Sequence, residues 1–143
     1  MKTKAGDSMS MGYGGGCRKY GENSDFVLYE YYAVDLNDEK YYNTNHLMDG
    51  LIKIDKSTFI EPKIHQRIKR RPSGRKILVT KRIERPVPYD EYLKAGRIEL
   101  VNSSFCSMRS NNGYGRVGLR LIREIYRYYQ INGEVPHKLS FMC

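Results

Sequence analysis

Four arginines near the end of the chain are the first residues whose type and spacing could do chemistry. They are Arg116, Arg120, Arg123 and Arg127. Their spacing of i, i+4, i+7 and i+11 places them along one side of a helix. A guanidinium group offers a planar fork of donors that suits phosphate oxygens, and neighbouring like charges repel unless an anion is near. The spacing therefore predicts an anion-binding row. The alternative is a solvated helix face on which Glu124 partly offsets the repulsion between the arginines.

A second basic cluster lies between residues 62 and 85, which hold ten Lys/Arg and one acid, Glu84. Clusters of this density are common phosphate-binding surfaces. The members that we expect to bind anions are Lys69, Arg70, Arg71, Arg75 and Lys76. The alternative is a basic turn that keeps a strand edge soluble, because lysines on an edge discourage aggregation.

Both clusters lie in the basic half of a chain of 143 residues with a net charge of +9. Residues 1–61 carry seven Lys/Arg against ten Asp/Glu, a net charge of −3, whereas residues 62–143 carry eighteen against six, a net charge of +12. Such a field concentrates anionic partners and speeds their encounter. We therefore expect the partner to be nucleic acid, either DNA or RNA, or an acidic protein surface. The oligomeric state stays open.

The segment 113–118 matches G-x-G-x-x-G and opens the helix that carries the arginines. A dinucleotide site needs a strand immediately before this motif and a full βαβ unit after it, and the sequence offers neither. What remains is a glycine-rich loop at a helix N-terminus. Backbone N–H groups of Gly113 and Gly115 could meet a phosphate there, beside Arg116 and Arg120.

Other site chemistries find little support in the sequence. The possible metal ligands are His46, His65, His137, Cys17, Cys106 and Cys143. They form no C-x-x-C or H-x-x-x-H pair, so we expect no metal and no cofactor. Three widely spaced cysteines fit free thiols in a reducing compartment. Cys106 has no histidine nearby in sequence to act as a base, and the acidic pairs form no hydrolase or nuclease pattern. The sequence therefore favours a protein that is not an enzyme, and it predicts no catalytic residue.

The first half must supply much of the core that positions these clusters. Residues 25–35 are aromatic and β-branched and apolar at both parities, which predicts a strand covered on both faces. Asp49-Gly50 predicts a turn between residues 47–48 and a strand over 51–55, giving an antiparallel meander. Among the thirteen tyrosines we expect most in the core. Base stacking by Tyr29 and Tyr31, or by Tyr32 on the opposite face, is the alternative.

The second basic cluster is expected on a helix, a turn and a strand. Ile60, Ile64 and Ile68 recur every four residues beside Pro62, which predicts a helix that ends before Pro72. Residues 72–74 predict a turn, and residues 76–83 a strand with alternating basic positions.

The arginine row is expected on the last and clearest helix. Residues 89–95 predict a short helix closed by Gly96, residues 97–101 a strand and residues 102–115 a loop. A helix over 116–130 should then end before Gly133. Its apolar side comprises Gly118, Leu121, Ile122, Ile125, Tyr128 and Tyr129, which must face the sheet.

These elements predict an α+β fold with a small, mostly antiparallel sheet of about four strands. The sheet packs against the C-terminal amphipathic helix and one or two shorter helices. We expect residues 1–24 to form a flexible, glycine-rich arm and residues 25–143 a single α+β domain. No apolar run approaches the roughly 20 residues of a membrane span, and the first residues lack a secretory signal. The sequence therefore predicts a cytoplasmic protein without a membrane partner.

Three functions remain open at this stage. The leading hypothesis is a basic nucleic-acid-binding module that grips the phosphate backbone with limited sequence specificity. The second is a small interaction protein, such as an inhibitor or accessory factor of a nucleic-acid enzyme, that docks through its basic face. The third is a site for a small phosphorylated ligand at the loop from Gly113 to Arg120.

Overall fold

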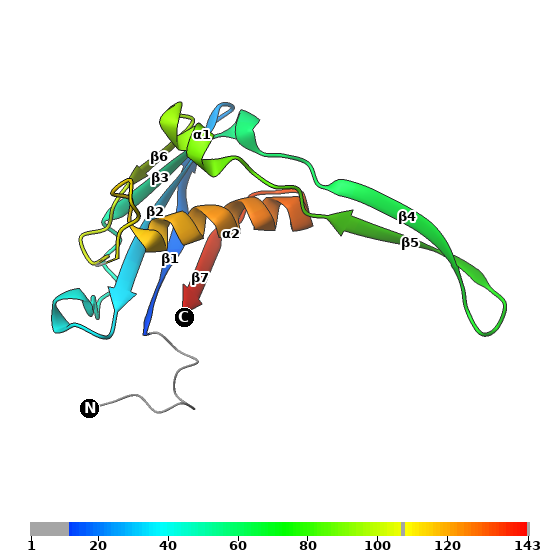
Figure 1. The fold of residues 1–143 in the computed structure, drawn as a ribbon, viewed down its shortest axis with the longest axis horizontal. Helices are drawn as coiled ribbons and strands as arrows, with labels where there is room; N and C mark the ends of the chain where they lie inside the picture. Colours follow the sequence, from blue (N-terminus) through cyan, green and yellow to red (C-terminus); the bar gives the residue numbers. More distant parts are fainter. Residues whose placement is uncertain (1–11, 107, 143) are drawn as a thin grey trace.

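A five-stranded antiparallel sheet forms the body of the protein. The computed structural model describes residues 12–106 and 108–142. In spatial order the sheet contains β6 (Ile98–Val101), β3 (Gly50–Asp55), β2 (Phe26–Asp35), β1 (Tyr13–Glu22) and β7 (Lys138–Met142). A separate two-stranded sheet contains β4 (Lys63–Arg70) and β5 (Lys76–Ile83) and extends away from the body (Figure 1). With the helices α1 (Tyr89–Lys94) and α2 (Arg116–Asn132), these elements confirm the predicted α+β class.

The long helix α2 covers one face of the five-stranded sheet (Figure 1). Gly118, Leu121, Ile122 and Ile125 of its predicted apolar side are buried. Tyr128 and Tyr129 are only half-buried, and the tyrosine that enters the core is Tyr126. Gly118 allows the close approach, because a Cβ there would lie 2.7 Å from Leu100 Cδ1. Gly133 ends the helix with a left-handed φ of 80°. The exposed side of α2 is therefore free to carry the arginines.

The N-terminal segment differs most from the sequence prediction. The flexible arm was expected over residues 1–24, but residues 13–22 form β1 between β2 and β7. A Cβ on Gly15 would lie 2.3 Å from Tyr32 O and 2.5 Å from Val117 Cγ1, and a Cβ on Gly16 would meet the Tyr32 ring at 2.7 Å. The glycines here permit close packing, whereas composition alone suggested chain flexibility. Residues 1–11 of the predicted arm lie outside the described residues.

The helix predicted from Ile60 to Pro72 is also wrong, because β4 occupies Lys63–Arg70. A four-residue repeat fits one side of a helix, but it is also a multiple of the two-residue repeat of a strand. Ile64 and Ile68 therefore share a face in either structure. The following turn and the strand β5 agree with the prediction.

Asp49-Gly50 does not form the predicted hairpin turn. β3 begins at Gly50, and the Tyr31 ring covers this residue so closely that a Cβ would lie 2.2 Å from the ring. The Asp49 carboxylate accepts hydrogen bonds from Ser103 Oγ at 2.6 Å and from the Ser104 N–H at 3.1 Å. The Asp-Gly pair thus connects the start of β3 to the loop that follows β6 in the sequence. The antiparallel pairing of β2 with β3 still agrees with the meander.

The remaining elements complete the sheet and its cover. The short helix α1, the strand β6 and the helix α2 form where the sequence predicted them. β7 was not predicted; it pairs antiparallel with β1. Cys17 and Cys106 are buried free thiols, and burial raises the pKa of Cys17 to about 12. Cys143 lies outside the described residues.

Candidate functional site

The two-stranded sheet outside the body is the most unusual feature of the fold. We call residues 63–83, which comprise β4, its turn and β5, the ribbon. The two strands pair antiparallel over eight residue pairs, from Lys63 opposite Ile83 to Arg70 opposite Lys76. Every strand residue is exposed except Ile77 and Val79, which are half-buried. The ribbon projects well beyond the sheet and α2 (Figure 1).

Local sequence explains why the chain folds into a ribbon here. Pro72-Ser73-Gly74 forms the tip, and Gly74 has a φ of 87° that favours glycine. The Arg71 N–H donates to Arg75 O and the Gly74 N–H donates to Arg71 O, each at 2.8 Å. The β-branched isoleucine, valine and threonine residues of the strands suit extended backbone. The turn therefore fixes the register of the two strands.

The ribbon carries a dense and uncompensated positive charge. Residues 63–83 contain nine Lys/Arg and no Asp or Glu. The cations are Lys63, Arg67, Lys69, Arg70, Arg71, Arg75, Lys76, Lys81 and Arg82. This set includes all five residues of the second cluster that the sequence singled out, and the structure gathers them at the outer half of the ribbon.

The root of the ribbon is fastened to the C-terminal end of α2. Arg82 Nη1 donates to the carbonyl oxygens of Gln130 at 3.2 Å and Ile131 at 3.0 Å, which lack partners within the helix. Buried Gln130 bonds Arg85 in both directions, accepting from its N–H at 2.7 Å and donating to its carbonyl at 2.9 Å. Sequence reasoning missed Gln130, because a lone glutamine in a helix carries no pattern that marks such a joint.

The arginine row lies on the exposed side of α2 and runs toward this root. Arg116, Arg120, Arg123 and Arg127 are all exposed. The Arg120 Nε lies 2.9 Å from Glu124 Oε2, and the Arg120 guanidinium group lies 4.9 Å from the centre of the Phe141 ring. The Arg127 Nε lies 4.0 Å from Glu84 Oε2, next to the root of the ribbon. The row therefore leads from the body to the ribbon, with Arg120 and Arg127 partly neutralised.

Acids from the first half of the chain are engaged with other partners. Glu22 binds Lys19 at 2.8 Å and Lys56 at 2.5 Å. Further contacts join Glu30 to Arg18, Asp55 to Arg97, and Glu61 to the Tyr129 hydroxyl. Glu22, Glu30 and Asp55 therefore balance cations of the body, and the charge of the ribbon stays in place.

The glycine-rich loop before α2 has fewer free donors than the sequence suggested. The Gly113 N–H donates to Ser110 O at 3.0 Å. The Gly115 N–H donates to Asn102 Oδ1 at 2.6 Å, and the Arg116 N–H donates to Met108 O at 2.9 Å. The two backbone groups expected to face a phosphate, and the neighbouring Arg116 N–H, therefore already have partners within the protein. The loop positions the start of α2 and lies at the opposite end of this helix from the ribbon (Figure 1).

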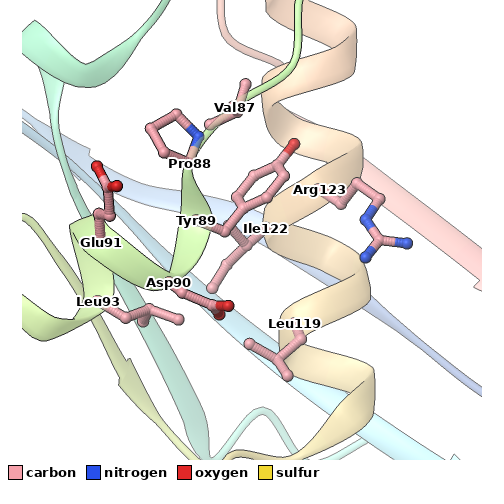
Figure 2. Close-up of a pocket in the computed structure, with 9 residues that line it drawn as sticks. All are labelled: Val87, Pro88, Tyr89, Asp90, Glu91, Leu93, Leu119, Ile122 and Arg123. Carbon is pink, nitrogen blue, oxygen red and sulfur yellow. The ribbon is translucent and has the colours of Figure 1, made fainter.

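A cavity of about 420 Å³ lies between α1 and α2, alongside the arginine row. Figure 2 shows its lining, with the Tyr89 ring between Arg123 and Glu91 in this view. Asp90 also lines it, so two acids share this cavity with Arg123. Burial raises the pKa of the Tyr89 hydroxyl to about 12. A polyanion would meet a less favourable field here than at the ribbon.

The tyrosines proposed for base stacking divide between the core and the outer sheet face. Tyr29 and Tyr31 are fully buried, and their hydroxyl groups bond Pro136 O at 2.6 Å and the Ser103 N–H at 3.0 Å. Tyr32 is half-buried and stacks on the His46 ring with centroids 4.2 Å apart. None of the three lies on the ribbon.

The described residues form neither a cluster of metal ligands nor a helix that could span a membrane. Within residues 12–106 and 108–142, no three His, Cys, Asp or Glu side chains gather in a way that could hold a metal ion. Among the same residues, no helix combines the length and apolar character needed to cross a membrane. No family model, curated protein or solved structure matches this chain.

Proposed function

We propose that this protein binds nucleic acid, holding the phosphate backbone with the ribbon and with the adjoining end of the arginine row. The observation that carries the proposal is the ribbon itself, where nine Lys/Arg and no acid lie on exposed strands and a turn. Cations this close repel one another, and an external polyanion relieves the repulsion while releasing its own counterions. Contacts of this kind hold the backbone with limited dependence on sequence.

Removal of ribbon charges tests the proposal against a matched control. We would change Lys69, Lys76 and Lys81 of the ribbon to Gln, and compare this variant with one in which Lys40, Lys94 and Lys138 of the body are changed to Gln. All six lysines are exposed, and both variants lower the net charge by three. Binding to labelled DNA and RNA is measured by fluorescence anisotropy over a salt series.

The ribbon variant should lose about tenfold or more in affinity at low salt. Its slope of log affinity against log salt should fall by about two to three, because each lost phosphate contact removes close to one unit. The body variant should keep the slope of the unchanged protein. Equal losses of affinity in both variants would mean that net charge alone explains the effect. No binding by the unchanged protein at low salt would overturn the proposal.

An acidic protein surface is the competing partner. It would use the same ribbon cations for encounter and orientation. Purification of the protein from its native host after nuclease treatment separates the two hypotheses. A stoichiometric protein partner that survives nuclease and is lost in the ribbon variant would favour the competing one.

A further inference from the structure

The ribbon exposes a strip of apolar side chains within its basic surface. Ile64, Ile68 and Leu78 are 51%, 69% and 63% exposed. Strand alternation and the register put all three on one face, with Ile68 directly opposite Leu78. The pairs Arg70–Lys76 and Ile64–Arg82 bracket this centre on the same face. We call this side of the ribbon the strip face.

Such a strip on an isolated ribbon calls for a partner. A two-stranded sheet is only marginally stable alone, and here neither face is covered by the body. Exposed apolar groups surrounded by polar residues mark interaction sites. The partner must accept apolar side chains and many cations together, which a surface of bases flanked by phosphates can do.

We propose that the ligand of the strip face is a B-form DNA duplex, and that the ribbon enters its major groove with Ile68 and Leu78 against the base edges; this inference rests on the proposed function. The eight residues of each strand span about 26 Å at about 3.3 Å per residue. The major groove is about 12 Å wide and admits a two-stranded ribbon, whereas the minor groove is about 6 Å wide.

The strip face also presents groups that suit base edges. Gln66 lies directly opposite Thr80, between the Ile64–Arg82 and Ile68–Leu78 pairs. Glutamine can bond adenine in the major groove, threonine can bond several bases, and aliphatic groups contact the thymine methyl. The opposite face carries Lys63, Arg67, Lys69 and Lys81, whose long side chains can reach the phosphates that line the groove.

Single-stranded nucleic acid and duplex RNA fit the ribbon less well. Proteins that hold single strands stack the bases on aromatic rings, and residues 63–83 contain no Phe, Tyr or Trp. The major groove of A-form RNA is deep and narrow, and side chains cannot read it. The ribbon therefore selects duplex DNA by shape, while its charges supply affinity for any phosphate backbone.

A substitution that keeps every charge tests this inference. Ile68→Thr with Leu78→Thr makes the centre of the strip polar and leaves a β-branched residue suited to a strand at both positions. The chain offers a matched control in Leu51→Thr with Val101→Thr, another directly opposed pair, 45% and 54% exposed on the outer face of the body sheet. Probes are a DNA duplex, an RNA duplex and a single DNA strand, all of one sequence.

We expect the unchanged protein to bind the DNA duplex at least tenfold more tightly than either other probe. The strip variant should lose about tenfold for the DNA duplex and less than about twofold for the single strand, with the salt slope unchanged because no phosphate contact is removed. The control pair should leave all three affinities unchanged. Since the strip packs against no part of the body, thermal unfolding of the strip variant should match that of the unchanged protein.

Chemical probing locates the groove. Dimethyl sulfate methylates guanine N7 in the major groove and adenine N3 in the minor groove, and the bound protein should protect guanine N7. Protection confined to adenine N3, equal binding of all three probes, or an unaltered affinity in the strip variant would each overturn the inference. The proposed function would survive those outcomes, because it fails when the unchanged protein binds no nucleic acid at low salt or when the ribbon lysines have no specific effect on binding.

Discussion

The ribbon and the outer face of the body sheet, which points away from α2, share residue types but differ in charge balance. Each presents a directly opposed pair of exposed apolar residues amid cations. On the sheet, Arg18 lies 2.5 Å from Glu30 and Lys53 lies 3.6 Å from Glu99. On the ribbon no acid is present among nine Lys/Arg. Exposed cations therefore mark a candidate binding surface here only where the protein leaves them without carboxylates.

The two regions also differ in what holds them in place. One face of the body sheet is buried under α2, whereas both faces of the ribbon are open to solvent. The body therefore gains stability from burial, and the ribbon depends on its turn, its strand pairing and the contacts at its root. Changes in the body should alter folding, and changes in the ribbon should alter binding.

The largest expected effect on folding comes from a methyl group added to β1. In Gly15→Ala the new Cβ would lie 2.3 Å from the Tyr32 carbonyl oxygen and 2.5 Å from Val117 Cγ1. Both neighbours are held in the sheet and the core, so the backbone must shift. We expect the free energy of unfolding in urea to fall by about 3 kcal/mol.

The same strand offers the control. A Cβ on Gly21 would meet nothing within 4 Å, so Gly21→Ala should change the free energy of unfolding by less than about 1 kcal/mol. Equal stability of the two variants would show that β1 does not pack tightly. Residues 13–22 would then behave as part of the flexible N-terminal segment that composition predicted.

The contrast between residues 13–22 and the rest of the fold shows what sequence could and could not predict. The helix α2 was predictable because its apolar and basic positions repeat with a helical period over many residues. β1 was not, because Gly14–Gly16 suggest flexibility until the Tyr32 ring and Val117 are placed against them. Their role is a tertiary effect that no local pattern encodes.

The candidate site, like the fold, could be predicted from the sequence only in part. Charge counting identified the basic residues of the ribbon and the arginine row, since net charge needs no fold. The ribbon itself was hidden, because isoleucines spaced by four satisfy both a helix and a strand. The N–H groups of Gly113 and Gly115 donate to Ser110 and Asn102, and these partners become visible only in three dimensions.

A substitution in the joint between α2 and the root of the ribbon should have the next largest effect on the free energy of unfolding. Gln130→Leu keeps the side-chain volume nearly constant but removes both hydrogen bonds to the Arg85 backbone, at 2.7 and 2.9 Å. We expect a loss of about 1 to 2 kcal/mol in unfolding free energy, because two backbone groups lose their partners near solvent. Hydrogen exchange at the Arg85 amide should become faster than in the unchanged protein.

Gln66→Leu serves as the control for this joint, because Gln66 is exposed on the ribbon. It should leave both stability and exchange at Arg85 unchanged. Unaltered protection of the Arg85 amide in Gln130→Leu would mean that the root is held by Arg82 and its contacts to the helix carbonyls.

The smallest expected effect lies in the neutralised charges of the body. Hydrogen bonds from Lys19 and Lys56 lower the pKa of Glu22 from 4.5 to about 2. A lowered pKa in the folded state stabilises the protein above pH 4.5, and this contribution is lost as the pH falls toward 2. Because these groups are partly exposed, Glu22→Gln should cost less than about 1 kcal/mol at pH 7.

Urea unfolding at several pH values between 7 and 2 measures this contribution. The stability difference between the unchanged protein and Glu22→Gln should shrink with falling pH and disappear near pH 2. Glu39→Gln, at an exposed acid of the same half, serves as the control. Neither change should weaken binding of nucleic acid to the ribbon, since both acids belong to the body. A difference that stays constant with pH would contradict the pairing of Glu22 with its two lysines. The body would then have one fewer internal ion pair, and its charge balance would differ less from that of the ribbon.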